Sequence, residues 1–431
     1  MQVSVETTQG LERRMTVTVP AERIESEVQN RLKNMAQTVR LKGFRPGKVP
    51  FKVMENRYGP SVRKDVVDDL TRRTFYEAVS RENIQLAGLP RFQSRVVEPG
   101  KNLEYEAVFE VMANVRLAPL GHVSITKPVA EITESDVDAM LENLRRQRAE
   151  WIEVDRPAAA GDRVIVTGTI DGQPFLGEQQ KPVILGSNVF KDLEDGLIGA
   201  RAGDERQLDL RFPQDYPAAV MAGKQAHFEL KVQSVAESKL PEIDAEFFKA
   251  FDIKDASLES LRQELRKTMQ DEMDGVIRGK IKQQVLDALY RENPIDAPNA
   301  QVEQHTDFLL DQARQTLKGQ GIPESDINLD RASFAKEARR RVVLGLIVAE
   351  IVKQQGFGAD PQRVHARVEA LASSYENPAE AVQWYYADRN RLANVEQLVL
   401  EDLVVDWVMG QVQVREERTT FEALLKERRS A

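Results

Sequence analysis

Hydrophobic and polar residues follow two different periods within the first 112 positions of the chain. On either side of Gly10, apolar residues alternate with polar ones, which is the pattern of half-buried strands joined by a turn. From Ala21 onwards, apolar residues recur three or four positions apart, which predicts an amphipathic helix that ends near Leu41. The expected strands and helices cover residues 2–8, 13–20, 21–41, 51–57, 61–81, 91–97 and 102–111. We therefore expect residues 1–112 to form a small α+β domain.

The pattern changes three times further along the chain. Residues 113–149 join an extended segment interrupted by prolines to a helix, and we interpret them as a linker. Residues 150–238 are glycine-rich and alternate like strands, with one short helix at 190–197, whereas residues 239–431 are almost entirely helical. The helices expected in this last region cover residues 257–290, 298–318, 332–355, 361–374, 390–409 and 420–426. The sequence thus predicts an elongated α+β multidomain protein with a β-rich middle domain and an all-α C-terminal domain.

The composition is that of a globular protein with a highly charged surface. Of its 431 residues, 41% are hydrophobic and 30% are charged, and the sequence contains no cysteine. This excludes disulfides, thiol nucleophiles and cysteine-ligated zinc. The longest notable uncharged apolar run, residues 342–349, is far shorter than the ~20 residues of a membrane-spanning helix. We expect a cytoplasmic protein with no secretory leader and no membrane partner.

Charge is distributed unevenly along the sequence. The net charge is −9, yet residues 1–115 carry 19 Lys and Arg against 15 Asp and Glu. The imbalance is strongest within residues 40–64, the basic district, where Glu55 is the only acidic residue beside eight cations. These cations are Arg40, Lys42, Arg45, Lys48, Lys52, Arg57, Arg63 and Lys64. A basic district in an acidic protein indicates an anionic partner, and chance clustering on a solvated surface is the alternative.

Motifs for catalysis or cofactor binding are incomplete in this sequence. The four histidines are scattered without a second metal ligand at a suitable spacing, and they are His122, His227, His305 and His365. The glycines within residues 195–203 follow a predicted helix, whereas a dinucleotide-binding turn follows a strand. Residues 326–337 match four ligand positions of a calcium loop, but Arg331 stands at the position of its glycine. We therefore expect no metal and no nucleotide cofactor.

One short stretch of the basic district combines rigidity, charge and an aromatic side chain. Residues 43–50 read GFRPGKVP, in which glycines permit unusual backbone angles and prolines restrict them. Arg45 can donate two hydrogen bonds to one phosphate or carboxylate, Lys48 adds a point charge, and Phe44 offers an apolar anchor. The stretch resembles the ribosome-docking signature of bacterial trigger factor, a loop tip that reads Gly-Phe-Arg-x-Gly-x-x-Pro.

The resemblance covers essentially the whole chain in the domain order of that family. It includes NRYGPSVRKDVVDDL after the tip, the strand-rich middle region, and helical segments such as RRRVVLGLIVAEIV and ASSYENPAEAVQWYY. It implies a ribosome-associated, ATP-independent chaperone that contacts ribosomal protein and RNA near the exit tunnel, holds newly made chains open, and assists their folding and export. The docking residues implied by the resemblance are Gly43, Phe44, Arg45, Pro46, Gly47, Lys48 and Pro50.

The middle domain is similar to FKBP-type prolyl isomerases, which use an apolar pocket without an acid, a base or a metal. By this resemblance the pocket is lined by Phe175, Leu193, Tyr216 and Phe228. Two positions depart from the family pattern, because Val166 stands where Tyr or Phe is usual and Leu193 stands where Phe or Trp is usual. Smaller side chains reduce the aromatic surface of the pocket. By this resemblance we expect a prolyl cis–trans isomerase whose activity the smaller side chains weaken, and a spacer or substrate-binding module is the open alternative.

The helical C-terminal region resembles the chaperone body of the family. Apolar residues scattered among charges on its helices are the candidates for binding clients, although helical stripes usually pack inside a core; they are Phe308, Phe334, Leu346, Trp384 and Tyr385. The expected partners are the ribosome and nascent or unfolded polypeptides, with a homodimer away from the ribosome as an open alternative. Two other functions compete with this one: a free-standing prolyl isomerase with substrate-recruiting domains, and an RNA-binding protein that uses the basic district.

Overall fold

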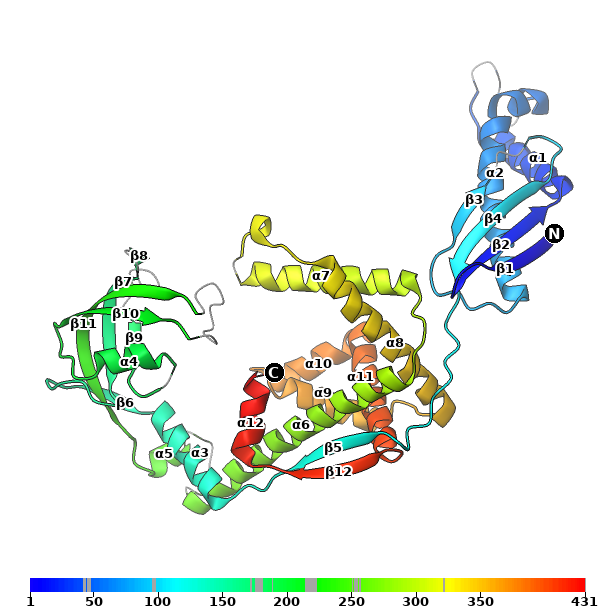
Figure 1. The fold of residues 1–431 in the computed structure, drawn as a ribbon. Coiled ribbons are helices and arrows are strands. Elements are labelled where there is room, and N and C mark those ends of the chain that lie inside the picture. The colour runs from blue at the N-terminus through cyan, green and yellow to red at the C-terminus, as the bar shows by residue number, and fades with distance from the viewer. Residues whose placement is uncertain are drawn as a thin grey trace. The chain divides into compact units, whose positions relative to one another are not determined.

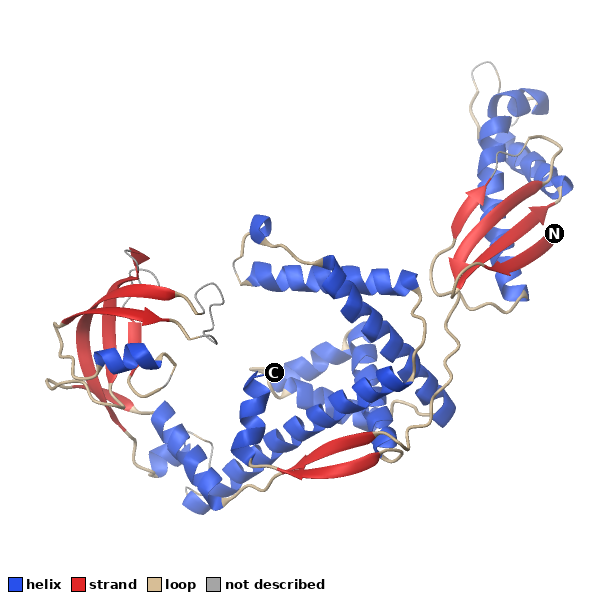
Figure 2. Cartoon of the chain, viewed as in Figure 1, coloured by secondary structure: helices blue, strands red, loops and turns tan. Residues whose placement is uncertain are grey.

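A computed structural model shows helices and strands packed around several separate hydrophobic cores (Figure 1, Figure 2). It describes all residues except 42–43, 45–47, 95–97, 171–172, 175–180, 188, 214–222, 250, 252–254, 256, 321 and 431. The strands are β1 (Gln2–Thr7), β2 (Glu12–Val19), β3 (Arg91–Ser94), β4 (Leu103–Glu110), β5 (Ser124–Val129), β6 (Glu150–Glu153), β7 (Arg163–Ile170), β8 (Gln173–Pro174), β9 (Lys181–Ile184), β10 (Glu205–Arg211), β11 (Gln225–Lys239) and β12 (Gln413–Arg418). The helices are α1 (Ala21–Thr38), α2 (Phe51–Arg81), α3 (Glu134–Gln147), α4 (Lys191–Leu197), α5 (Ala245–Lys249), α6 (Leu258–Glu292), α7 (Asn299–Gly319), the 3₁₀ helix η1 (Glu324–Asp326), α8 (Arg331–Gln355), α9 (Pro361–Ala372), α10 (Pro378–Tyr386), α11 (Arg389–Met409) and α12 (Phe421–Ser430).

The N-terminal domain packs α1 and α2 against a four-stranded antiparallel sheet with the strand order β1-β2-β4-β3. The sequence predicted two helices over 51–81, but α2 is one continuous helix of 31 residues that contains Pro60. A proline inside a helix removes one backbone hydrogen bond. Met54 and Val62, on either side of Pro60, are both buried in the same core, and this shared burial keeps the two halves of α2 in line.

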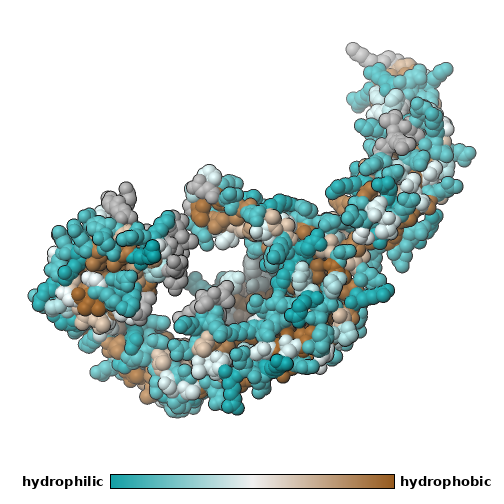
Figure 3. Space-filling view, in the orientation of Figure 1, coloured by the Kyte–Doolittle hydropathy of each residue, from teal (hydrophilic) through white to brown (hydrophobic). Residues whose placement is uncertain are grey.

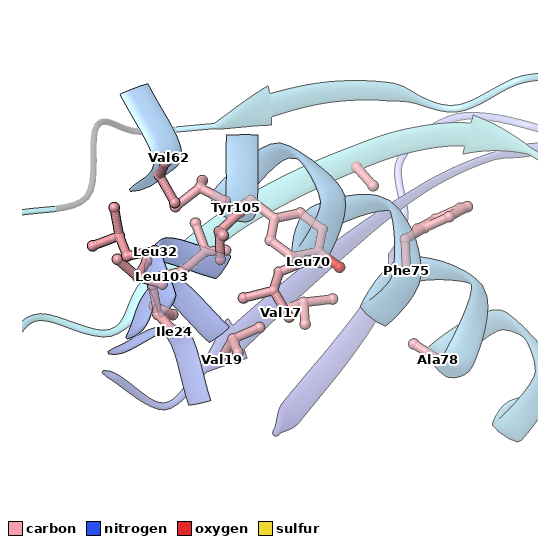
Figure 4. Packing of buried hydrophobic residues seen from close by; sticks show 14 of the residues in the cluster. Val17, Val19, Ile24, Leu32, Val62, Leu70, Phe75, Ala78, Leu103 and Tyr105 are labelled. Carbon is pink, nitrogen blue, oxygen red and sulfur yellow. The ribbon is translucent and has the colours of Figure 1, made fainter. Parts of the chain in front are cut away.

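The core of this domain lies between the sheet and the two helices (Figure 4). Tyr105 on β4 and Phe75 on α2 are among its largest fully buried side chains. The ring of Phe75 packs edge-on against Phe92 and Phe109, with centroids 5.4 and 5.3 Å away. The Tyr105 hydroxyl lies 2.9 Å from the hydroxyl of Thr74, so this buried polar group has a hydrogen-bond partner. The packed core fixes both helices that flank the segment 39–50.

The middle domain is an antiparallel sheet in which β11 is paired with β10, β7 and β6, while β7 also pairs with β8 and β9. Helix α4 packs beside this sheet near β10 (Figure 1). The approach of β7 to β11 requires glycine at position 168, because an added Cβ would lie 1.9 Å from the carbonyl oxygen of Glu229. The short helix predicted at 190–197 is confirmed as α4.

The extended segment after the N-terminal domain packs on the helical region. Its buried apolar residues, which share a core with α6, α7, α8 and α11, are Leu120, Val123 and Ile125. Side-chain amides of α6, and of Asn293 directly after it, form hydrogen bonds with the backbone of the extended segment. Asn293 accepts one from the Ala118 N–H at 2.8 Å. Gln284 both accepts from the N–H of Thr126 at 2.9 Å and donates to its carbonyl oxygen at 2.8 Å. These side chains therefore hold the segment against the helices.

The predicted α+β multidomain organisation is confirmed, but the region 239–431 is not all-α. Strand β12 pairs with β5 in a two-stranded sheet, which the sequence did not predict because its pairing partner lies almost 300 residues earlier. Helix α10 was also not predicted. Pro378 is at the first position of this helix, where its missing N–H has no partner to lose. The other long C-terminal helices begin and end within a few residues of their predicted bounds.

The chain divides into two compact units. Met1–Lys127 and Gly279–Arg415 form one unit, which contains the N-terminal domain and helices α7 to α11. Pro128–Arg278 and Glu416–Ala431 form the other, which contains the middle domain. Among the described residues, no helix combines the length and the apolar character that crossing a membrane requires.

Candidate functional sites

The segment between α1 and α2 is anchored on both sides and leaves an aromatic side chain exposed between its anchors. Leu41 and Val49 are each 8% exposed and belong to the core of the N-terminal domain. Between them, Phe44 is 39% exposed, and its backbone N–H donates to the carbonyl of Leu41 at 3.1 Å. Lys48 is exposed, and Pro50 precedes α2 with an extended backbone. The other predicted docking residues, which lie outside the described residues, are Gly43, Arg45, Pro46 and Gly47.

Among the described residues, the ion pairs of this domain leave several cations unpaired before α2 and in its first half. Four carboxylates of α1 and α2 are engaged between the helices in the pairs Arg63–Glu25, Arg31–Asp69, Arg73–Glu27 and Arg23–Glu77, at 2.6, 2.5, 2.9 and 3.1 Å. In contrast, Arg40, Lys48, Lys52 and Lys64 are exposed, and no ion pair joins them to a carboxylate within the described part of the chain. Their charge is therefore available to an external anion, and Lys48 is four positions from the exposed Phe44 in the sequence.

Three phenylalanine rings meet in the core of the middle domain. Phe190, at the start of α4, lies 5.2 Å from Phe212 and 5.8 Å from Phe228, measured between ring centroids. Phe212 and Phe228 are 5.6 Å apart. Leu193 and Val166 belong to the same core, so aliphatic side chains stand beside the three rings. All three rings are buried, so this dry, apolar and partly aromatic wall is part of the core of the domain.

The structure thus brings two of the four predicted pocket residues, Leu193 and Phe228, into one core, and Phe175 and Tyr216 lie outside the described residues. Sequence reasoning missed Phe190 and Phe212. The only sequence feature that could have identified them is their place beside a regular element, because Phe190 directly precedes α4 and Phe212 directly follows β10. Which rings meet depends on strand pairing, which the sequence pattern alone does not specify.

The same domain contains a buried carboxylate, Asp162, directly before strand β7. Asp162 is 4% exposed and accepts hydrogen bonds from the Arg156 guanidinium at 2.6 and 3.0 Å and from the Ala159 N–H at 2.8 Å. Burial raises the pKa of Asp162, but the bonds from Arg156 and Ala159 and the charge of Arg156 outweigh it, so the pKa lies below its ordinary value. Among the described residues, no group of three or more His, Cys, Asp and Glu side chains is arranged to hold a metal ion.

The five predicted client-binding residues divide into two groups. Phe308 on α7 and Trp384 on α10 are 59% and 49% exposed, and Figure 3 shows hydrophobic surface over parts of α7. Phe334 and Leu346 on α8, and Tyr385 on α10, are half-buried against neighbouring helices. The first group can contact another polypeptide directly, and the second group supports the helices that present it.

Trp384 belongs to an aromatic cluster that the sequence revealed only in part. Tyr375 and Tyr386, which were not predicted, are 49% and 43% exposed. The Trp384 ring packs edge-on against Tyr385 at 5.1 Å, and the Arg391 guanidinium lies 3.8 Å from its centroid while donating to the Trp384 carbonyl at 2.6 Å. Burial raises the pKa of Tyr385, and its hydrogen bond with Tyr375 raises it further. The contacts with Tyr385 and Arg391 hold the Trp384 ring in its exposed position.

Comparisons with known proteins identify the family. Residues 1–144 match the family described as "Bacterial trigger factor protein (TF)", and residues 257–410 match "Bacterial trigger factor protein (TF) C-terminus". The trigger factor of Thioalkalivibrio sulfidiphilus is 42% identical over 434 residues, which cover 100% of this chain and 99% of that protein. The chain belongs to the trigger factor family. Residues 154–233 of this family member also match "FKBP-type peptidyl-prolyl cis-trans isomerase".

Other relatives agree with this assignment. The trigger factors of Azotobacter vinelandii and Pseudomonas aeruginosa are each 42% identical over 431 residues, covering 99% of this chain and 98% of those proteins. A solved structure described as "Promiscuous Substrate Recognition in Folding and Assembly Activities of the Trigger Factor Chaperone" has a TM-score of 0.52 at 19% identity. It covers 95% of this chain and 100% of that chain, which supports the fold. The protein is therefore a chaperone of the trigger factor family that contains an FKBP-type domain.

Proposed function

We propose that this chaperone docks on the ribosome through residues 43–50 and holds emerging polypeptides on exposed aromatic side chains of its helices, in the cytoplasm and without ATP. The observation that carries the docking site is the exposed Phe44 between the buried anchors Leu41 and Val49, in the same segment as the exposed Lys48, which pairs with no carboxylate among the described residues. Anchoring on both sides lowers the entropy lost on binding. Cations in this position can replace counterions on ribosomal RNA or pair with acidic side chains of a ribosomal protein.

Each part of the chain has a separate task in this proposal. Residues 1–112 bind the ribosome, residues 113–149 link, residues 150–238 form the isomerase-like domain, and residues 239–431 bind clients. The exposed Phe308 and Trp384 are the described residues of the predicted client site that support this last task best.

Co-sedimentation with ribosomes tests the docking site. The triple variant Phe44→Ala, Arg45→Ala, Lys48→Ala should bind at least about tenfold more weakly, because it lacks an apolar anchor and two charges. The slope of log affinity against log salt should fall by roughly one for each phosphate group that the variant no longer neutralises. Undiminished binding would refute the assignment, and equal affinity for any naked RNA would favour the RNA-binding function.

A matched control removes the same types of side chain from exposed positions elsewhere in the same domain. It combines Tyr76→Ala, Arg81→Ala and Lys101→Ala, of which Tyr76 is 49% exposed. This variant should bind ribosomes like the unmodified chain. A loss as large as that of the tip variant would show that general charge and hydrophobicity of the domain, and not residues 43–50, determine binding.

The middle domain supports prolyl cis–trans isomerisation. The reaction rotates an amide bond over a barrier of ~18–20 kcal/mol and needs no proton transfer. An apolar wall such as that of Phe190, Phe212 and Phe228 favours the twisted amide, which has lost its resonance and is easily desolvated. An assay of the full chain on a Xaa-Pro peptide should show acceleration over the spontaneous rate. A folded chain without acceleration would refute the isomerase function and leave the docking proposal untouched.

A further inference from the structure

Glu194 on α4 is an unusual residue for a protein core. Among the described residues, the only buried carboxylates are Asp162 and Glu194, and Glu194 is 3% exposed. Its carboxylate accepts hydrogen bonds from the Gly186 N–H at 2.9 Å, the Ser187 hydroxyl at 2.8 Å and the Phe190 N–H at 3.0 Å. A buried carboxylate is stable only when such donors replace its water. All three donors lie in the turn that joins β9 to α4.

These bonds hold a backbone conformation that is not part of a regular element. Gly186 has a φ of +86°, and Phe190 has φ −142° and ψ 78°. Phe190 occupies the N-cap position of α4, where its side chain cannot accept a hydrogen bond from the helix. Glu194 instead reaches back to the Phe190 N–H, much as the acidic residue of a capping box does. The Glu194 carboxylate therefore holds the backbone that carries the Phe190 ring.

We propose that Glu194 is a positioning residue for prolyl isomerisation, which holds Gly186, Ser187 and Phe190 in place so that Phe190 meets Phe212 and Phe228 before a prolyl residue binds. This inference rests on the isomerase function proposed above. Glu194 is buried beneath the turn and acts through Phe190. A preformed apolar wall stabilises the twisted amide more than the planar one, so loss of Glu194 should lower kcat and leave KM nearly unchanged.

The test measures isomerisation of a Phe-Pro peptide by the full chain, well below the melting temperature of every variant. Glu194→Gln retains the shape but turns one oxygen into an NH₂ group that cannot accept a hydrogen bond. We expect about tenfold lower kcat and KM within about twofold of the unmodified value. The matched control is Asp195→Asn, which removes the same charge from an exposed position of α4 that pairs with Lys191, and its kcat should be unchanged.

A second control separates positioning from a general loss of stability. Val235→Ala removes methyl groups from a residue of the same core that is 1% exposed, so it also destabilises the domain. It should keep its kcat under conditions where circular dichroism shows it fully folded. The amide protons of Gly186 and Phe190 should shift upfield in Glu194→Gln, because their bonds to a charged oxygen weaken.

The outcomes distinguish this inference from the function on which it rests. An unmodified chain no faster than the spontaneous reaction would overturn the isomerase function and, with it, the role of Glu194. An active chain whose kcat is unchanged in Glu194→Gln would overturn the positioning role alone. Equal losses of kcat in Val235→Ala and Glu194→Gln would overturn it as well, because loosening of the whole domain would then account for both.

Discussion

Replacing Thr74 by valine removes the hydroxyl group that pairs with Tyr105 in the core of the N-terminal domain. Thr74 and Tyr105 are 0% and 1% exposed, so water cannot substitute for the missing group. Thr74 Oγ1 donates its single proton to the Leu70 carbonyl at 2.6 Å, and the Tyr105 hydroxyl therefore donates to Thr74 across 2.9 Å. Valine has nearly the same shape as threonine, so the change leaves the Tyr105 hydroxyl buried without this acceptor.

An unsatisfied buried hydroxyl group costs about 1–3 kcal/mol, so Thr74→Val should lower the unfolding free energy of this domain by about 2 kcal/mol. Tyr105→Phe removes the donor and leaves Thr74 bonded to Leu70, which should cost about 1 kcal/mol. The double variant leaves neither group unpaired. Its total loss should therefore be about 1–2 kcal/mol, less than the sum of the single losses.

The assay is native-state hydrogen exchange of amides in β4, because a chain with several cores does not unfold in one step. Burial raises the pKa of Tyr105 to about 12, so its hydroxyl stays protonated and the result should not change between neutral and mildly alkaline pH. A double variant that loses the full sum of about 3 kcal/mol would refute the hydrogen bond between the two residues.

Other changes test the remaining parts of the chain. Gly168→Ala should destabilise the middle domain by more than about 3 kcal/mol, because the added Cβ would lie 1.9 Å from the Glu229 carbonyl oxygen. Gly279 in α6 has open space around it, so Gly279→Ala should stabilise the chain by up to about 1 kcal/mol. Thermal melting measures both effects. Folding lowers the pKa of Asp162, so its contribution to stability is complete above the unfolded pKa of about 4 and is lost as the pH falls through the folded pKa. Asp162→Asn should therefore abolish this part of the dependence of the melting temperature on acid pH. Trp384→Ala combined with Tyr386→Ala should weaken suppression of client aggregation about tenfold while circular dichroism shows the chain still folded, whereas Tyr76→Ala should leave this activity unchanged. Equal chaperone activity of the two variants and the unmodified chain would contradict the proposed client surface.

The helices were the most predictable part of the fold, because burial follows the helical period directly. Ile24, Val28 and Leu32 are the buried residues of α1, at the spacing that predicted it. The continuity of α2 was not predictable from local rules, because a proline is normally a break and only packing on both sides of Pro60 overrides it. Strand β12 depends on a partner far away in the sequence, which no local pattern identifies.

The candidate sites were predictable to different degrees. Phe44 and Lys48 stood out because glycines and prolines mark a loop, and loops lie at the surface. Phe190 and Phe212 were missed because their contact arises from the pairing of β10 with β11 and the position of α4. Tyr386 was missed because exposure on a helix with few buried residues does not follow from its spacing.

The most direct test of the central claim links docking to client binding in one measurement. A photo-crosslinking amino acid at position 384 should form a crosslink to a stalled nascent chain on ribosomes. The crosslink should disappear with the triple variant of Phe44, Arg45 and Lys48 and persist with the control variant of Tyr76, Arg81 and Lys101. An equally strong crosslink in the tip variant, or none in the otherwise unmodified chain, would contradict the account.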